Sequence, residues 1–306
     1  MEKEYLKLSV LLSALCAVAG EGCSLELRPP RVVVGFGDSV LVSCVASRPV
    51  RVLGWEAAIG SAHTQRDLTV QWGVDSLKDW IEEPICYGVF FTAPRQCEEK
   101  LNLVLYKIPD SVSISAVSHT GPMVEGGQYQ LQCEVQNIAP VQYLTLRWYR
   151  GQTEVYNHTF SDLTTDTPVQ VSSTLLIIPN RTDDGAQYSC VAQLELGPEG
   201  PQPSPQVKSE PLNITVHYPP TFSSPDDETL EVTEEQQGAP LNCHAQGNPP
   251  PEYSWASPLS PEEKLGQTLI TSTRLPPGTH IYICTASNHL GQQSKEFTVK
   301  IIPKGV

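Results

Sequence analysis

Positive charge is scarce in this chain of 306 residues. It holds 20 lysine and arginine residues against 34 aspartate and glutamate residues, so its formal net charge at pH 7 is −14. No run of basic residues interrupts this composition. A protein of that charge is repelled by phosphate backbones, because binding to nucleic acid depends on lysine and arginine contacts to phosphates. We therefore expect no nucleic-acid partner.

Motifs for catalysis and metal binding are also missing. The chain contains no Gly-x-Ser-x-Gly, no His-Glu-x-x-His, no Cys-x-x-Cys and no histidine at zinc-ligand spacing. Gly37-Asp38-Ser39 resembles the nucleophile block of the Gly-Asp-Ser lipases, but the Asp-x-x-His that would activate the serine occurs nowhere. We interpret Gly37-Asp38 as a turn before a strand. We predict no enzyme activity, no small-molecule substrate, no cofactor and no metal of its own.

Long apolar runs are absent after the first thirty residues, so neither a membrane-spanning helix of about 18 apolar residues nor a lipid-anchor tail is expected. The apolar segment at residues 8–19 is too short to span a bilayer. It follows Lys3 and Lys7 and ends in Ala17-Val18-Ala19, an A-x-A cleavage site. These features predict a secretory signal peptide over residues 1–22.

This leader predicts an extracellular protein, either secreted or the ectodomain of a single-pass plasma-membrane protein. The sequence does not decide whether the missing anchor reflects truncation or a soluble form. Removing Cys16 with the leader leaves an even number of cysteines, which in an oxidising compartment indicates disulfides. The eight remaining cysteines are Cys23, Cys44, Cys86, Cys97, Cys133, Cys190, Cys243 and Cys284.

A strand pattern surrounds the first cysteine of each core pair. Tyr129, Leu131, Cys133 and Val135 share one face of an alternating segment, and glutamine and glutamate fill the other face. Period-two alternation of this kind predicts a half-buried antiparallel strand. The segments around the equivalent cysteines at positions 44 and 243 repeat the pattern.

Each of these cysteines is followed by a tryptophan, at 55, 148 and 255, and two of the second cysteines are preceded two positions earlier by a tyrosine. This spacing is the signature of the immunoglobulin sandwich, in which a disulfide joins two facing sheets and the tryptophan packs on it. The sequence therefore predicts an all-β protein of three tandem immunoglobulin-like sandwiches after the signal peptide. The predicted core disulfides are Cys44–Cys86, Cys133–Cys190 and Cys243–Cys284.

Proline-containing joints at Pro109 and at Pro219-Pro220 set the predicted domains at residues 23–108, 109–217 and 218–306. The first domain has an additional cysteine pair. Cys23 precedes the first strand and Cys97 precedes the last, and in such sandwiches part of the first strand runs parallel beside the last. We therefore pair Cys23 with Cys97, although four cysteines allow three pairings and the sequence alone does not choose among them.

Three N-glycosylation sequons occur, at Asn157, Asn180 and Asn213, all in the middle domain. In a secreted protein a sequon indicates exposed backbone, so we predict a glycoprotein.

The candidate binding residue is Glu56, which follows Gly54-Trp55 at the end of the first domain's third predicted strand. Together with residues 40–44, Pro84-Ile-Cys86-Tyr87 and the segment 121–133, this motif resembles the intercellular adhesion molecules, to which the vascular cell adhesion molecule is related. The resemblance covers essentially residues 23–303.

This resemblance implies cell–cell adhesion in the immune or vascular system. In that family the acidic residue at this position binds a leukocyte integrin by coordinating a divalent cation that the integrin holds, and a hard cation suits a carboxylate ligand. Carried over, Glu56 is the integrin-binding residue. Glu82 and Glu83 are weaker candidates for a flanking contact.

The chain departs from the family motif in two ways. After Glu56 it has Ala57-Ala58 in place of the usual Thr or Ser followed by Pro. Mammalian members also carry a second cysteine four residues after each core cysteine, where this chain has Arg48 and Phe90. The identity of the integrin therefore stays open, and an ordinary solvated glutamate is the alternative interpretation of Glu56.

Two other functions are alternatives for a protein of this architecture. A sialic-acid-binding receptor of immunoglobulin type requires an arginine on the strand of the first domain's second cysteine, and residues 86–91 contain none. A soluble decoy or structural protein without an integrin site would show the same three domains.

Overall fold

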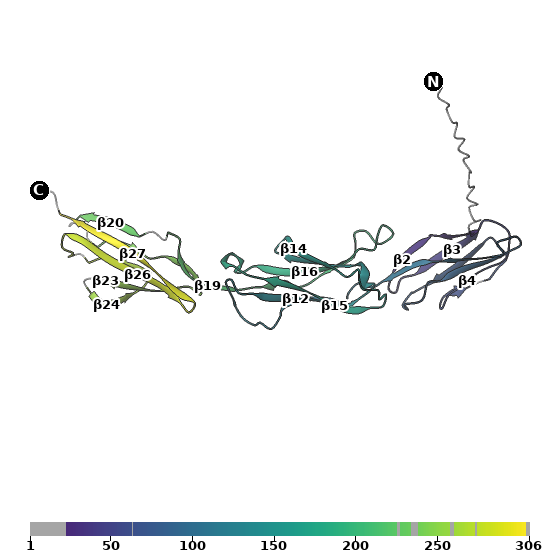
Figure 1. Ribbon diagram of the computed structural model, residues 1–306, viewed down its shortest axis with the longest axis horizontal. Coiled ribbons are helices and arrows are strands. Elements are labelled where there is room, and N and C mark those ends of the chain that lie inside the picture. The colour runs from purple at the N-terminus through teal and green to yellow at the C-terminus, as the bar shows by residue number, and fades with distance from the viewer. Residues whose placement is uncertain are drawn as a thin grey trace, which may run out of the picture.

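A computed structural model of the chain describes residues 23–303 except 63, 225–226, 234–237, 258–259 and 273. The predicted signal peptide lies outside these residues. Strands dominate the described residues, and their helical elements are two short 3-10 turns, η1 (Val141–Tyr143) and η2 (Arg181–Asp183). Three sandwiches follow one another in a row (Figure 1). The predicted all-β class and tandem immunoglobulin architecture are confirmed. No helix in the described part is long and apolar enough to cross a membrane.

The first sandwich packs a four-stranded sheet, in the order β1-β3-β6-β5, against the three-stranded sheet β4-β7-β8. β2 and β9 pair in parallel, as expected for the first and last strands. The bounds are β1 (Leu25–Arg28), β2 (Arg31–Gly35), β3 (Val40–Ala46), β4 (Val50–Glu56), β5 (Ser61–Ala62), β6 (Thr69–Val74), β7 (Ile85–Phe90), β8 (Gln96–Lys100) and β9 (Asn102–Tyr106).

The second sandwich packs the sheet β10-β12-β15 against the sheet β14-β13-β16-β17, and β18 also pairs with β16. Its bounds are β10 (Ser111–Ala116), β11 (Met123–Val124), β12 (Tyr129–Ile138), β13 (Leu144–Arg150), β14 (Thr153–Thr159), β15 (Val169–Ile177), β16 (Gln187–Leu194), β17 (Gln206–Lys208) and β18 (Leu212–Asn213).

The third sandwich contains the sheet β20-β27-β26-β23-β24 and the pair β21-β25. β19 joins it to the second sandwich, because the strand pairs with β11 at its start and with β22 farther along. The bounds are β19 (Val216–Phe222), β20 (Glu228–Thr233), β21 (Pro240–Asn242), β22 (Ala245–Asn248), β23 (Glu252–Ser257), β24 (Ser260–Leu265), β25 (Thr268–Ile270), β26 (Gly278–Asn288) and β27 (Gly291–Ile302).

Each sandwich has its own apolar core, built on a disulfide and a tryptophan as the spacing predicts. Cys44–Cys86, Cys133–Cys190 and Cys243–Cys284 are bonded. The tryptophan that follows each first cysteine is at most 4% exposed. Each indole N–H donates to an oxygen inside its own sandwich, so these large rings are buried without leaving their polar atom unpaired.

The predicted fourth bond, Cys23–Cys97, is wrong for this structure, because both thiols are free. Cys97 precedes the last strand, β9, as predicted. It lies within β8, in register with Gly88 on β7, and its side chain is buried. The Sγ of Cys23 lies 4.0 Å from the carbonyl oxygen of Glu98. The two thiols are hydrogen-bonded neighbours, and burial followed by this hydrogen bond raises the pKa of Cys23 to about 11.

The joint between the first two sandwiches is packed. Lys107 and Ala139 exchange two backbone hydrogen bonds across it, of 2.8 and 3.2 Å. Arg31 on β2 donates to the Glu199 carboxylate at 2.7 Å and to the carbonyl oxygen of Leu196. The proline-rich segment 196–205 is a loop between β16 and β17, and its start contacts the first sandwich. These contacts hold the end of the first sandwich that lies at the joint against the second sandwich.

Candidate functional site

Glu56 is the last residue of β4, in the three-stranded sheet of the first sandwich. Its side chain is exposed and has no hydrogen bond or ion pair with any described residue. Trp55, its neighbour, is buried and donates its indole N–H to the carbonyl oxygen of Val70 on the facing sheet, at 3.3 Å. The strand that presents the carboxylate is therefore fixed through the core up to its final residue.

The chain after Glu56 is also anchored. The fully buried Trp72 on β6 donates its indole N–H to the carbonyl oxygen of Ile59, at 2.9 Å. Gly60 follows with φ of +92°, a conformation that favours glycine, and an added Cβ there would lie 2.7 Å from the carbonyl oxygen of Gly73. Glu56 thus stands between two segments that are each held by a tryptophan.

Gly54 has a packing reason to be glycine. A Cβ at this position would lie 2.8 Å from the ring end of Tyr87 on β7. Tyr87 is the register partner of Gly54 in the antiparallel pair β4–β7. The Gly-Trp-Glu motif therefore has three different local roles: close approach of a neighbouring ring, burial in the core, and presentation of a carboxylate.

The outer face around Glu56 is a short row across three strands. Glu56 pairs with Ile85 on β7, and Ile85 pairs with Lys100 on β8. Directly opposite residues on antiparallel strands project to the same face. The carboxylate is therefore flanked by an aliphatic side chain and then by an ammonium group, on a flat sheet surface.

One exposed carboxylate can supply one or two of the six to eight oxygen ligands that a cation such as Ca²⁺ takes. Among the described residues, no group of three or more histidine, cysteine, aspartate or glutamate side chains is arranged to hold a metal ion. Glu56 can therefore complete the coordination of a cation held elsewhere, and it has no described neighbours with which to build a complete site.

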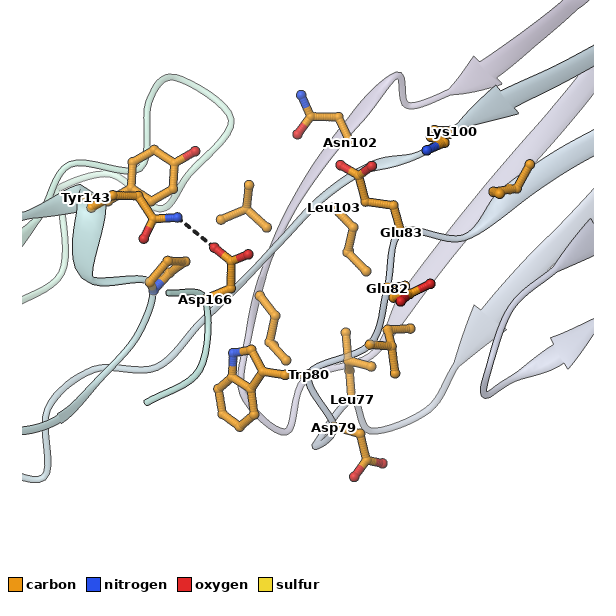
Figure 2. Close-up of a pocket in the computed structure, with 16 residues that line it drawn as sticks. Leu77, Asp79, Trp80, Glu82, Glu83, Lys100, Asn102, Leu103, Tyr143 and Asp166 are labelled. Atoms are coloured by element: carbon orange, nitrogen blue, oxygen red, sulfur yellow. Dashed lines mark hydrogen bonds between the residues drawn. The ribbon is translucent and has the colours of Figure 1, made fainter. Parts of the chain in front are cut away.

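Glu82 and Glu83 lie between β6 and β7 and line a pocket of about 460 Å³ at the joint of the first and second sandwiches. Ile85 and Lys100 line the same pocket, so it begins at the row that carries Glu56. Figure 2 shows Glu82 and Glu83 on one side of the pocket, Tyr143 and Asp166 of the second sandwich on the other, and Trp80 below Asp166.

Sequence reasoning missed this pocket. Trp80, Gln142 and Asp166 belong to no motif, and 86 positions separate the first from the last. The one available signal was Trp80 itself, which lies outside the repeated cysteine–tryptophan spacing.

The three sequon asparagines, Asn157, Asn180 and Asn213, are all exposed. Asn180 caps η2, because its side-chain oxygen accepts from the backbone N–H of Thr182 at 2.9 Å. Asn157 donates its side-chain amide to Glu154. All three side chains are open to modification on the second sandwich.

A family model described as an immunoglobulin domain matches residues 220–301. Vascular cell adhesion protein 1 of Homo sapiens is 24% identical over 307 residues, which cover 92% of this chain and 39% of the relative. Intercellular adhesion molecule 5 of Homo sapiens is 30% identical over 205 residues, covering 64% of this chain and 21% of the relative. Intercellular adhesion molecule 1 of Macaca mulatta is 29% identical over 273 residues, covering 86% and 47%. The chain thus spans about two fifths of the vascular relatives' length.

Solved structures agree on the fold. The ICAM-5 D1–D4 ectodomain fragment matches with a TM-score of 0.51 at 21% identity, covering 91% of this chain and 76% of that chain. The full ectodomain (Ig1–Ig3) of mouse nectin-like molecule 4 matches with a TM-score of 0.54 at 20% identity, covering 90% and 98%. At these identities the likeness supports the tandem immunoglobulin fold alone.

Proposed function

From the premise that the chain belongs to the immunoglobulin superfamily, with the vascular and intercellular cell adhesion molecules as relatives, we propose that it is a cell-adhesion glycoprotein whose first sandwich binds a leukocyte integrin through Glu56. The relatives support an adhesion protein with a cell-surface partner. The choice of an integrin as the partner and of Glu56 as the contact residue rests on the Gly-Trp-Glu motif and on the geometry around it.

In the proposed mechanism, a carboxylate oxygen of Glu56 enters an open coordination position of a divalent cation that the integrin holds. The cation belongs to the partner, and this chain supplies one hard oxygen ligand. A side chain on a rigid strand loses little conformational freedom on docking, which leaves more of the interaction energy as affinity. The flat row of Ile85 and Lys100 would form the surrounding contact.

The observation that carries this proposal is an exposed carboxylate that has no partner among the described residues and lies at a strand end. A buried tryptophan anchors the strand before it, and a second one anchors the segment after it. A glutamate that served only solubility would need no such support. A single metal-centred contact of this kind is weak, so we expect adhesion to depend on several copies acting together.

The second sandwich is proposed to carry N-linked glycans at Asn157, Asn180 and Asn213. Their placement on one sandwich leaves the β4-β7-β8 face of the first sandwich free for a partner. Digestion with a peptide N-glycosidase should lower the mass of the secreted chain by three glycans, and by two in each single Asn→Gln variant.

The test is adhesion of the secreted chain, coated on a surface, to cells that display leukocyte integrins. Adhesion should require Mg²⁺, disappear with a chelator, and fall at least about 30-fold with Glu56→Gln, the loss expected of a hot spot of ~2 kcal/mol. Glu98→Gln is the matched control, since Glu98 lies on the same sheet opposite Tyr87. If the Glu56→Gln variant adheres as strongly as the unchanged chain, the integrin contact does not involve Glu56 and this proposal is wrong.

A further inference from the structure

The pocket at the joint of the first two sandwiches combines an apolar floor with charged walls. Leu77 and Leu105, which are at most 7% exposed, line it together with Leu103. Its volume of about 460 Å³ has room for a long side chain and part of its main chain. The close-up in Figure 2 shows Leu103 between Asp166 of the second sandwich and Glu83 of the first.

The walls are strongly acidic. Four carboxylates and one ammonium group line the pocket, so its formal charge is negative. Within the described part of the chain, neither Glu82 nor Glu83 makes a hydrogen bond or an ion pair, and Lys100 neutralises neither of them. Carboxylates gathered in a partly enclosed space attract a cation, because their like charges repel one another. The charged lining residues are Asp79, Glu82, Glu83, Asp166 and Lys100.

Two buried polar atoms in the lining have no partner among the described residues. One is the indole nitrogen of Trp80, a donor, and the other is the side-chain oxygen of Gln142, an acceptor. Gln142 is fixed in this orientation because its amide nitrogen donates to Asp166 at 2.6 Å. Buried polar groups are nearly always paired, so an unpaired donor and an unpaired acceptor in a single pocket match a ligand that offers both an acceptor and a donor.

We propose that this pocket receives an arginine side chain from a loop of a protein partner. The guanidinium presents five donors in a planar fork, which suits the adjacent oxygens of Gln142 and Asp166 and the carboxylate of Glu83 on the opposite wall. The aliphatic stem packs on the leucines, and a main-chain carbonyl of the loop accepts the Trp80 indole N–H. A lysine has three donors at one point and satisfies fewer of these acceptors.

The pocket is a second contact site, distinct from Glu56. Ile85 and Lys100 belong to both the pocket lining and the row that carries Glu56, so one partner can reach both places. The arginine site does not depend on the cation, however, because its contacts are hydrogen bonds and ion pairs to this chain alone. Its test is therefore independent of integrin binding.

The experiment is a titration of the secreted full chain, labelled with ¹⁵N-tryptophan, with the capped peptide acetyl-Gly-Arg-Gly-amide. The five tryptophans give five indole signals, and Trp80→Phe identifies the one in the pocket. The Trp80 signal should shift saturably with the arginine peptide, about tenfold more weakly with the lysine peptide, and not at all with the neutral citrulline isostere.

Two sets of variants complete the test. Glu83→Gln combined with Asp166→Asn should raise the dissociation constant at least tenfold, whereas Glu56→Ala and Glu98→Gln should leave it unchanged. Because both pocket residues are exposed, these substitutions do not disturb the core. An unshifted Trp80 signal, or equal shifts with arginine and citrulline, would overturn the proposal, whatever the outcome of the integrin experiment.

Discussion

The guanidinium carbon of Arg48 lies 4.3 Å from the centre of the Phe90 ring, which is 1% exposed. By the resemblance seen in the sequence, these are the two positions at which mammalian members of that family carry a second cysteine pair. Arg48 also donates through its terminal nitrogens to Thr92 and to the carbonyl oxygens of Ala93 and Pro94. A cation–π contact and hydrogen bonds therefore stand where that family has a covalent bridge, and they tie the β3–β4 turn to the β7–β8 loop.

We expect Arg48→Ala to destabilise the first sandwich by about 1–3 kcal/mol, because it removes the cation–π contact and several charge-assisted hydrogen bonds. Hydrogen exchange read by mass spectrometry can resolve the three sandwiches, which a single melting curve cannot. Arg51→Ala is the matched control. Arg51 lies 5.1 Å from the ring of the exposed Phe91, so its loss should change exchange little. Equal effects of the two variants would contradict this prediction.

The anchoring of the chain after Glu56 can be tested through Trp72. Trp72→Phe keeps the aromatic packing but removes the N–H that bonds to Ile59, and should cost the first sandwich about 1–3 kcal/mol. Because it frees the segment beside Glu56, we expect integrin-dependent adhesion to fall as well. Trp148→Phe removes an indole N–H bond, to Ser173, from the second sandwich. It should destabilise that sandwich and leave adhesion unchanged, and a loss of adhesion in both variants would refute the local role of Trp72.

The raised pKa of the Cys23 thiol, about 11, predicts that this thiol is alkylated slowly at neutral pH. Only the thiolate reacts with alkylating agents, so modification of native Cys23 by iodoacetamide should be slow at pH 7.4 and rise about tenfold per pH unit until about pH 11. A thiol whose pKa is higher in the folded than in the unfolded state stabilises folding below the unfolded pKa. That contribution should disappear as the pH rises through about 11.

Intact mass after alkylation under denaturing conditions reports the state of the pair. Two alkyl groups per chain are expected, one each on Cys23 and Cys97. A chain that takes up none contains the disulfide that the cysteine spacing suggested, and this would contradict the free thiols of the structure.

The second joint is held by Arg181, which contacts Glu125 through two nitrogens, at 2.8 and 2.9 Å, and donates to Thr221 Oγ1 at 2.6 Å. Arg181→Ala should free the joint of β19 and widen the distribution of end-to-end distances in small-angle scattering. Arg147→Ala is the control, because its ion pairs with Glu154 and Glu195 stay within the second sandwich. An unchanged scattering profile for Arg181→Ala would show that β19 and contacts such as the Asn248–Asp184 hydrogen bond maintain the joint without Arg181.

The same contact has a defined pH dependence. Hydrogen bonds from Arg181 hold the pKa of Glu125 below its ordinary value. A carboxyl whose pKa is lowered on folding contributes stability above the unfolded pKa, and loses it as the pH falls through the folded pKa. The scattering profile should therefore broaden in acid, below about pH 4.5, and the Glu125→Gln variant should lack that broadening.

The repeated spacing of Cys44, Trp55 and Cys86, and of its two counterparts, was enough to predict three sandwiches and their core disulfides. These features could be predicted because they depend on the period of single strands and on distances along the chain that one fold constrains. The position of Glu56 at a strand end followed from the same pattern, and the structure places it there. Its partner remains a proposal, since a sequence pattern does not contain the second molecule.

Other features depended on contacts between segments far apart in the chain. Only the tertiary structure brought Trp80 to the same pocket as Gln142 and Asp166. It also set Cys97 within β8, where its thiol lies beside that of Cys23 without forming a disulfide. The physical reason is that side-chain distances across a joint or between strand ends depend on register and on packing of the sandwiches. The spacing of residues along the sequence determined the three cores, and the packing between those cores decided the pocket.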